Sequence, residues 1–280
     1  MKALSKARRR TARRAARKVA DSTVMEAAAR WGFAARGVVY LLVGTLAWQV
    51  ALGDAQQQAD RGGALHQLSG GPFGATVIWA LGAGFAGMAV WRLSEAAVGA
   101  SGHDGRKVTK RLQAAARCLV YSSIAVSVLA YASGRRDGSE SSDRTSQDLT
   151  ARVMELPGGR WAVACAGAGL AVGGAWIAVR ALRRKFRKHL DLSGMRRRAR
   201  RAVDVLGVVG GTSRGAVFAG AGVFAVRAAL AYDPDRAKGV DDTLRSFAHT
   251  PAGPWLLAAV AAGLVLFGAF SLALARWRTV

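Results

Sequence analysis

The amino-acid sequence predicts an all-α integral membrane bundle of six transmembrane helices, built from three tandem helical hairpins. Three observations lead to this prediction: six long apolar segments, the placement of basic residues between them, and a sequence pattern that occurs three times. The chain has 280 residues, of which 51% are hydrophobic and 21% are charged, and its net charge is +24. A chain with this many apolar residues and this much positive charge fits neither a disordered tail nor an ordinary basic soluble domain. The charged residues must therefore be segregated from the apolar stretches.

Six segments are long and apolar enough to cross a bilayer. A spanning helix needs about 20 mostly apolar residues, because the hydrocarbon is roughly 30 Å thick and each helical residue rises about 1.5 Å. A single soluble core of this size would not bury six such helices. The predicted spans cover residues 37–52, 73–91, 114–132, 161–179, 215–232 and 252–275.

The basic residues predict the orientation of these spans. Of the 41 lysines and arginines, 31 lie in residues 1–36, 92–117, 180–214 and 276–280. The alternate loops carry nine, and Arg227 lies within a span. By the positive-inside rule, both termini and the long basic loop are expected in the cytoplasm. The Ala, Gly and Arg bias of the chain is typical of a GC-rich bacterial coding sequence, so the expected location is the bacterial inner membrane.

The first 30 residues are expected to form a basic cytoplasmic tail on anionic lipid. A cleaved signal peptide does not fit, because no compact apolar core with a small-residue cleavage site follows directly. Nucleic-acid binding is disfavoured, because no aromatic residues are interleaved with the arginines for base stacking. Membrane lipid is therefore the expected partner of this tail.

The odd-numbered spans share one beginning, and the even-numbered spans share another feature. Ala-Arg-Gly-Val-Val-Tyr at 35–40 matches residues 116–121 and 213–218, which gives the pattern small-Arg-x-x-Val-aromatic. Each even span carries two glycines five residues apart, and small residues of this kind allow close helix packing in lipid. These glycines are Gly82 and Gly87, Gly169 and Gly174, and Gly263 and Gly268.

Three matches in the same order predict three hairpins inserted with the same orientation. The predicted organisation is a basic tail over 1–30, a first repeat over 31–100, a second over 107–192 with a basic interfacial extension, and a third over 196–280. Cys118 and Cys165 then lie near opposite ends of the second hairpin, beyond the roughly 7 Å limit for a disulfide, and are expected to stay unpaired.

The chain resembles a bacterial membrane family called domain of unknown function 1206. The resemblance rests on Ala-Arg-Gly-Val-Val-Tyr at 35–40, Gly-Gly-Ala-Leu at 62–65 and Pro-Phe-Gly at 72–74. It is strongest in the first hairpin, because the second has Cys118 where the motif prefers glycine and Arg160 in place of proline. Members of this family carry three hairpins in tandem, so the resemblance implies a fold and a membrane location but no activity.

Arginines at two depths are the candidate binding residues. Arg36, Arg117 and Arg214 begin the odd spans, where each side chain can snorkel to lipid phosphates. Alternatively, the three form a ring around a pseudo-threefold axis that binds lipid headgroups or another anion. Arg227 lies deeper, at the level where the first repeat has Gln49. It either snorkels to the outer headgroups or faces Gln49 across the bundle and binds an anion or a lipid phosphate.

Short amphipathic helices are expected in the three outer loops. Leucines and other apolar residues recur there at helical spacing, at Leu65 and Leu68, Leu149, Val153 and Leu156, and Leu244 and Phe247. The fourth span is expected to continue as a basic interfacial helix, because Leu182, Phe186 and Leu190 recur every four residues among lysines and arginines. Lipid is the expected contact of that helix, with a protein partner as the alternative.

The sequence offers no catalytic or metal-binding constellation. No two of its four histidines fall at metal-ligand spacing with a carboxylate, and no nucleotide-binding motif is present, so neither a metal nor a cofactor is expected. Carboxylates are absent from the predicted spans, which argues against proton-coupled transport. The sequence therefore favours a non-catalytic membrane scaffold or organiser that binds anionic lipid at its cytoplasmic face, with no nucleic acid and no identified protein partner. The alternative is a channel or transporter for a small or anionic solute near the pseudo-threefold axis.

Overall fold

Six long helices cross the bundle, in agreement with the predicted spans. The structure, a computed structural model, describes residues 23–53, 58–99, 108–135, 142–190, 195–233, 236–238, 240–248 and 253–278. Six helices in these ranges are long and apolar enough to cross a membrane, which confirms a multi-pass all-α membrane protein. They are α2 (Thr23–Ala51), α4 (Gly74–Val98), α5 (Val108–Ala132), α7 (Gly159–Leu182), α8 (Arg197–Ala231) and α10 (Gly253–Trp277).

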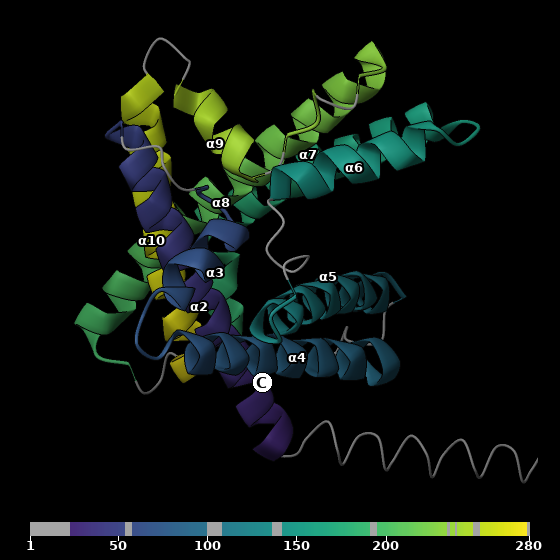
Figure 1. The fold of residues 1–280 in the computed structure, drawn as a ribbon. Helices are drawn as coiled ribbons and strands as arrows, with labels where there is room; N and C mark the ends of the chain where they lie inside the picture. The colour runs from purple at the N-terminus through teal and green to yellow at the C-terminus, as the bar shows by residue number, and fades with distance from the viewer. Residues whose placement is uncertain are drawn as a thin grey trace, which may run out of the picture.

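The six helices form an open ring (Figure 1). The most extensive contacts join the second helix of one hairpin to the first helix of the next, as α4 with α5, α7 with α8, and α10 with α2. Within the hairpins, α2 packs on α4 and α8 packs on α10, but the described parts of α5 and α7 do not pack along each other. Figure 1 shows α5 and α7 splayed apart on the right of the view. The ring is therefore open inside the second hairpin.

Two helices begin more than ten residues earlier than the apolar segments predict. The first predicted span starts at residue 37 and the fifth at 215, whereas α2 begins at Thr23 and α8 at Arg197. Alanine and arginine are strong helix formers, so each helix extends into the basic segment before its apolar part. The Glu26–Arg30 ion pair of 2.6 Å, one turn apart, supports the first turns of α2. The tail expected over 1–30 is thus helical from Thr23, and its first 22 residues lie outside the described ranges.

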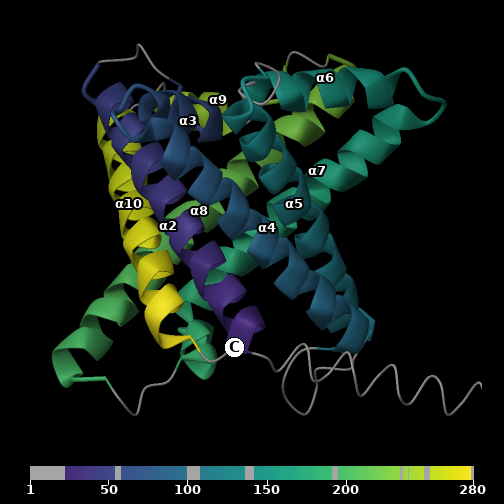
Figure 2. The ribbon, with the colours of Figure 1, turned by 60° about the horizontal axis from the view of Figure 1, so that its bottom comes forward.

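The three outer loops contain the short helices that the sequence predicts. They are α3 (Arg61–Ser69), α6 (Ser142–Met154) and α9 (Val240–Ala248), and Figure 2 shows them at the end of the bundle opposite the C-terminus. Leu65 and Leu244 are fully buried, so α3 and α9 pack their apolar faces onto the bundle itself. The Ala59 amide donates to Asp241 Oδ1 at 2.8 Å and connects the approach to α3 with α9.

The interfacial helix expected after the fourth span is not formed, which corrects that expectation. The helix α7 ends at Leu182, Arg184 takes a left-handed backbone with φ of 51°, and a 3-10 helix, η2 (Lys185–His189), follows. Phe186 packs edge-to-face on Phe270 of α10, with 5.0 Å between ring centroids. The apolar side of this segment therefore packs on the protein's own bundle, because the left-handed backbone at Arg184 ends the helix and lets Phe186 reach α10.

Glycines bring the transmembrane helices into backbone contact. A Cβ atom built on Gly174 of α7 would lie 2.4 Å from the Ala219 amide nitrogen of α8, and one on Gly215 would lie 2.7 Å from the Gly174 carbonyl oxygen. At the crossing of α10 and α2, a Cβ on Gly268 would lie 2.9 Å from the Gly37 carbonyl oxygen. Packing of this kind stabilises helices in lipid, where there is no hydrophobic drive between them.

Candidate functional site

Two of the repeat arginines bind a tyrosine of the next repeat. Arg36 Nη1 on α2 donates to Tyr121 Oη on α5 at 3.4 Å, and Arg214 Nε on α8 donates to Tyr40 Oη on α2 at 2.9 Å. The first bond runs from repeat one to repeat two, and the second from repeat three to repeat one. The contacts therefore follow the cyclic order of the ring. They bring Arg36 and Arg214 within electrostatic range of each other.

Arg117, the repeat arginine of the second repeat, has no such partner. The position equivalent to Tyr40 and Tyr121 in the third repeat is Phe218, which carries no hydroxyl group. Arg117 on α5 is exposed and donates no hydrogen bond to any residue that the structure describes, although Glu95 lies within electrostatic range. The cyclic pattern is thus interrupted at the second repeat. The guanidinium N–H groups of Arg117 are therefore available to another acceptor.

Two further arginines complete the site. Arg92 on α4 is 5% exposed, pairs with Glu95 and lies 4.0 Å from the ring centroid of Trp91. Arg278, just beyond α10, lies over Phe33 at 4.8 Å and over Trp91 at 5.1 Å. Four buried side-chain atoms among the described residues lack a hydrogen-bond partner, and two of them, the Nε atoms of Arg92 and Arg278, lie in this site. A buried donor left unpaired costs about 1–3 kcal/mol, so these two atoms mark a place where an acceptor is missing.

These five residues are called the arginine cluster below: Arg36, Arg92, Arg117, Arg214 and Arg278. Burial, together with the charges of Arg92, Arg36 and Arg117, lowers the pKa of Arg278 to about 9, against the opposing charge of Glu95. Arg278 is still protonated at neutral pH. The cluster therefore concentrates positive charge around one carboxylate, and guanidinium groups match the oxygens of phosphate and carboxylate anions.

Aromatic rings and a further hydroxyl group, besides those of the two tyrosines, hold the cluster in place. The Cζ atom of Arg36 lies 4.9 Å from the Phe33 ring centroid, and that of Arg214 lies 5.0 Å from the Phe267 centroid. Arg36 Nε also donates to Ser271 Oγ at 3.2 Å. Stacked guanidinium groups lose little freedom on binding an anion, because their planes are already fixed.

Replacement of Tyr40 by phenylalanine should lower the melting temperature in detergent by a few degrees. The hydroxyl accepts the 2.9 Å bond from the charged Nε of Arg214, and bonds to charged groups contribute about 1.5–3 kcal/mol. Differential scanning fluorimetry measures the shift. Tyr131→Phe is the matched control, because the exposed Tyr131 hydroxyl only donates to Ser69 Oγ at 3.1 Å. Equal shifts for the two variants would contradict a special role for the Tyr40 bond.

Replacement of Arg278 by glutamine should raise the melting temperature of the anion-free protein by a few degrees. The folded protein lowers the pKa of Arg278 to about 9, so the charged side chain costs stability at every pH below that value. The cost is relieved only as the pH rises from about 9 toward the unfolded value. Fluorimetry at pH 7 and low ionic strength measures the gain. A loss of stability would show that the stacking on Phe33 and Trp91 outweighs the charge repulsion.

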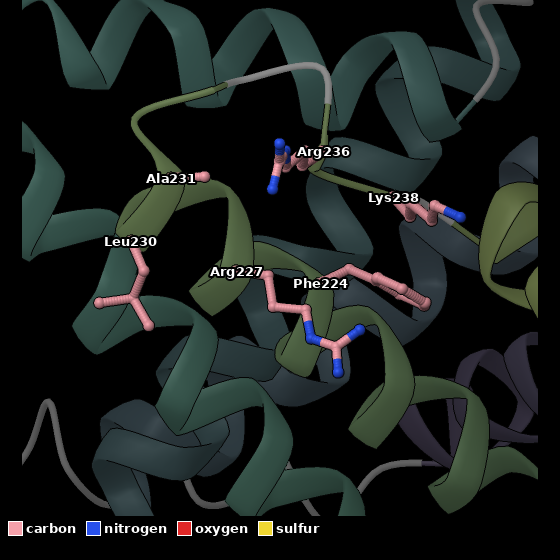
Figure 3. Close-up of a pocket in the computed structure, with 6 residues that line it drawn as sticks. All are labelled: Phe224, Arg227, Leu230, Ala231, Arg236 and Lys238. Carbon is pink, nitrogen blue, oxygen red and sulfur yellow. The ribbon is translucent and has the colours of Figure 1, made fainter.

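Arg227 and Gln49 are not brought together. Both side chains are exposed, Gln49 on α2 and Arg227 on α8, and no hydrogen bond joins them. Arg227 instead lines an open pocket of about 680 Å³ at the far end of α8 (Figure 3). The other lining residues are Phe224, Leu230, Ala231, Arg236 and Lys238. Arg227 is therefore separate from the arginine cluster.

The predicted packing glycines differ in their surroundings. A Cβ atom built on five of them would lie within 3.1 Å of an atom of a neighbouring helix. These five are Gly82, Gly87, Gly174, Gly263 and Gly268. A Cβ on Gly169 of α7 would have no heavy atom within 4 Å. This open position faces away from the α8 contact that Gly174 makes.

Sequence reasoning identifies three of the five arginines in the cluster. Arg92 and Arg278 fall outside the repeated motif, and they join the cluster only through the packing of α4 and α10 on α2. The spacing of Arg92 and Glu95, one helical turn apart, was the available signal for a buried pair.

Comparison with known proteins agrees with the repeated architecture. No solved structure matches the chain. The uncharacterized protein YxxB of Bacillus subtilis (strain 168) is 31% identical over 245 residues, which is 87% of each chain. The family described as Domain of Unknown Function (DUF1206) matches residues 31–99, 112–184 and 209–278, and each matched segment holds one hairpin of the ring. The chain therefore belongs to the DUF1206 family and carries three copies of its domain in tandem.

Proposed function

We propose that the protein is a non-catalytic membrane organiser that binds the phosphate of anionic lipid headgroups in its arginine cluster, on the cytoplasmic side of the inner membrane. One observation carries this proposal. Arg92 is 95% buried, its Nε lacks an acceptor among the described residues, and the charges around it are mostly those of other arginines. Burial of several cations together costs free energy unless an anion neutralises them, so the cluster favours binding of an oxyanion.

The depth of the cluster supports a headgroup as the source of that anion. Arg36 and Arg117 both lie fifteen residues before the end of their helices, at Ala51 and Ala132. At about 1.5 Å per residue, they stand roughly 22 Å from the end of the bundle that carries α3, α6 and α9. In hydrocarbon about 30 Å thick, this level lies in the leaflet at the basic end of the bundle, within reach of its phosphates for a long side chain.

The positive-inside rule supports the cytoplasmic side. The basic end of the bundle includes the start of α2, the α7–α8 connection and Arg278. These belong to the segments 1–36, 92–117, 180–214 and 276–280, which hold 31 of the 41 lysines and arginines. The cytoplasmic leaflet of bacterial membranes carries anionic lipid, to which each nearby cation contributes about 1 kcal/mol. The guanidinium groups of the cluster add direct hydrogen bonds to this general attraction.

A titration with inorganic pyrophosphate in uncharged detergent tests the oxyanion chemistry of the cluster. Binding to the folded state at 100 times the dissociation constant adds about 2.7 kcal/mol of stability, so the wild-type melting temperature should rise by several degrees. Arg117→Gln should lose at least half of this rise. Arg117 is exposed and donates no hydrogen bond to a described residue, so the variant should fold normally.

Arg227→Gln is the matched control for this titration. Arg227 is also an exposed arginine in a transmembrane helix, but it lies in the separate pocket on α8. It should respond to pyrophosphate as the wild type does. An equal loss in Arg117→Gln and Arg227→Gln would mean that the response follows net charge alone, and no response in the wild type would refute the oxyanion site.

A further inference from the structure

The second hairpin lacks a helix contact that the first and third hairpins make. Gly84, Gly169 and Gly263 are equivalent, because each lies fifteen residues before the end of its matched family segment. A Cβ on Gly84 would lie 2.8 Å from Ala35 Cβ, and one on Gly263 would lie 1.8 Å from Ser213 Oγ. A Cβ on Gly169 would meet nothing within 4 Å. By the repeat it should face Ala116, which is instead exposed.

The side chain that fills the other two hairpins is missing from the second. One turn after these glycines, the first and third repeats have Met88 and Phe267. A Cβ built on Gly32 would lie 2.7 Å from Met88 Cβ, and one built on Gly210 would lie 2.8 Å from Phe267 Cβ, so both side chains sit directly over a glycine of the partner helix. The second repeat has Gly173 at this position, again with nothing within 4 Å of its Cβ site. Gly173 therefore places no side chain in the space between α7 and α5, and neither Gly169 nor Gly173 meets a neighbouring helix.

The separation leaves an apolar face of α5 and one of α7 without a helix partner, and the space between these two faces is called the α5–α7 groove below. By equivalence with the closed hairpins, its walls are Leu112 and Ala116 of α5 and Cys165, Gly169, Val172 and Gly173 of α7. Leu112 and Val172 are 64% and 69% exposed, and Cys165 is an exposed free thiol. A surface of small and apolar side chains in lipid fits a hydrocarbon chain.

One end of this groove is positively charged. Arg117 of α5 and Arg180 of α7 lie within electrostatic range of each other, and Arg117 donates no hydrogen bond to a described residue. Arg180 follows Gly169 by eleven residues, which is about 16 Å along α7. The groove therefore offers two cations at one end and an apolar wall about as long as an acyl chain. This combination is complementary to an anionic amphiphile.

We infer that the α5–α7 groove binds one anionic phospholipid from the bilayer, with its phosphate between Arg117 and Arg180 and an acyl chain along Gly169 and Gly173. The inference rests on the proposed function, since Arg117 belongs to the arginine cluster. It adds the place of the lipid's acyl chain, along α7, and the route by which the lipid reaches the cluster, sideways through the open second hairpin.

Gly173→Met tests the groove, because it gives the second repeat the side chain that the first has in Met88. Native mass spectrometry in uncharged detergent with added phosphatidylglycerol or phosphatidylcholine measures the bound lipid. The wild type should retain one phosphatidylglycerol with about a tenfold preference over phosphatidylcholine, which corresponds to about 1.4 kcal/mol. Gly173→Met should lose this lipid at least tenfold and keep the melting-temperature response to pyrophosphate.

Ala175→Met is the matched control, because Ala175 is exposed two residues away, on another side of α7. It should retain the lipid as the wild type does. If Gly173→Met still retained phosphatidylglycerol, or if the two lipids bound equally, the proposal of a lipid in the groove would be overturned. The proposed oxyanion site would not be. A wild type that binds neither phosphatidylglycerol nor pyrophosphate would overturn both. A dimer of the chain that Gly173→Met disrupts would show that a second copy, not a lipid, fills the groove.

Discussion

Gly174→Met should lower the melting temperature in detergent by about 10 °C, whereas Gly173→Met should change it by no more than about 2 °C. A Cβ at Gly174 would lie 2.4 Å from the Ala219 nitrogen and 2.7 Å from the Gly215 carbonyl oxygen. These are backbone atoms, so α8 would have to move as a whole. A Cβ at Gly173 would meet nothing within 4 Å.

The two variants insert the same side chain at neighbouring positions of one helix. They therefore share any change in helix propensity and hydrophobicity, and a difference between them reports the α7–α8 contact alone. Scanning fluorimetry without added lipid gives the comparison. Similar melting temperatures for the two variants would mean that the close backbone approach of α7 and α8 is not what stabilises this pair.

Glu95→Gln should also lower the melting temperature by about 10 °C. Glu95 pairs with Arg92, whose side chain is 6% exposed, and its charge also opposes the repulsion on Arg278. Removal of one partner of a buried pair costs about 3–5 kcal/mol, because the other charge stays buried without compensation. Added pyrophosphate should restore part of the loss, since it supplies the missing negative charge to the cluster.

Glu26→Gln is the control for this variant. Glu26 also pairs with an arginine one turn away, Arg30, but both side chains are more than 40% exposed. Exposed pairs of this kind contribute about 0.3–0.5 kcal/mol, so the change should be about 1 °C. If Glu95→Gln behaved like Glu26→Gln, Arg92 would have to be solvated in the membrane, and the argument for a missing anion would fail.

The sequence predicts the spans well because hydropathy and helix length are local properties. The starts of α2 and α8 are missed, since a helix does not stop where its apolar residues stop. Residues 182–190 show the opposite error. Their four-residue spacing is helical, but Arg184 reverses the chain so that Phe186 can pack on Phe270. Local periodicity does not include the free energy that this tertiary contact provides.

The depth of a residue is easier to predict than its direction. Arg227 follows Arg214 by thirteen residues, and at about 100° per residue it points roughly 220° away from it around the helix. Arg214 faces Tyr40, so Arg227 points to another side of α8, where it is exposed and lines the pocket near the end of that helix. The prediction that Arg227 faces Gln49 used only the depth of the two residues in the membrane and not their directions around their helices.

The arginine cluster shows how far repeats can guide the prediction of a site. The shared motif identifies Arg36, Arg117 and Arg214, and an aromatic residue lies four residues later in each repeat. The departures from symmetry are what give the site its open side. Phe218 replaces the tyrosine, and Gly173 replaces the bulky side chain found in the other two hairpins. Their consequences become visible only when the helices are placed next to each other.

The most direct test of the anion site is crystallographic. Crystals grown in a lipidic mesophase and soaked with tungstate, a tetrahedral oxyanion that scatters anomalously, should show one anomalous peak within hydrogen-bonding distance of the Arg92 or Arg278 Nε atoms. Arg117→Gln crystals soaked in the same way should show a weaker peak. If the tungstate peaks were confined to the exposed basic loops and the arginine cluster showed no anomalous density, the proposed anion site would be contradicted.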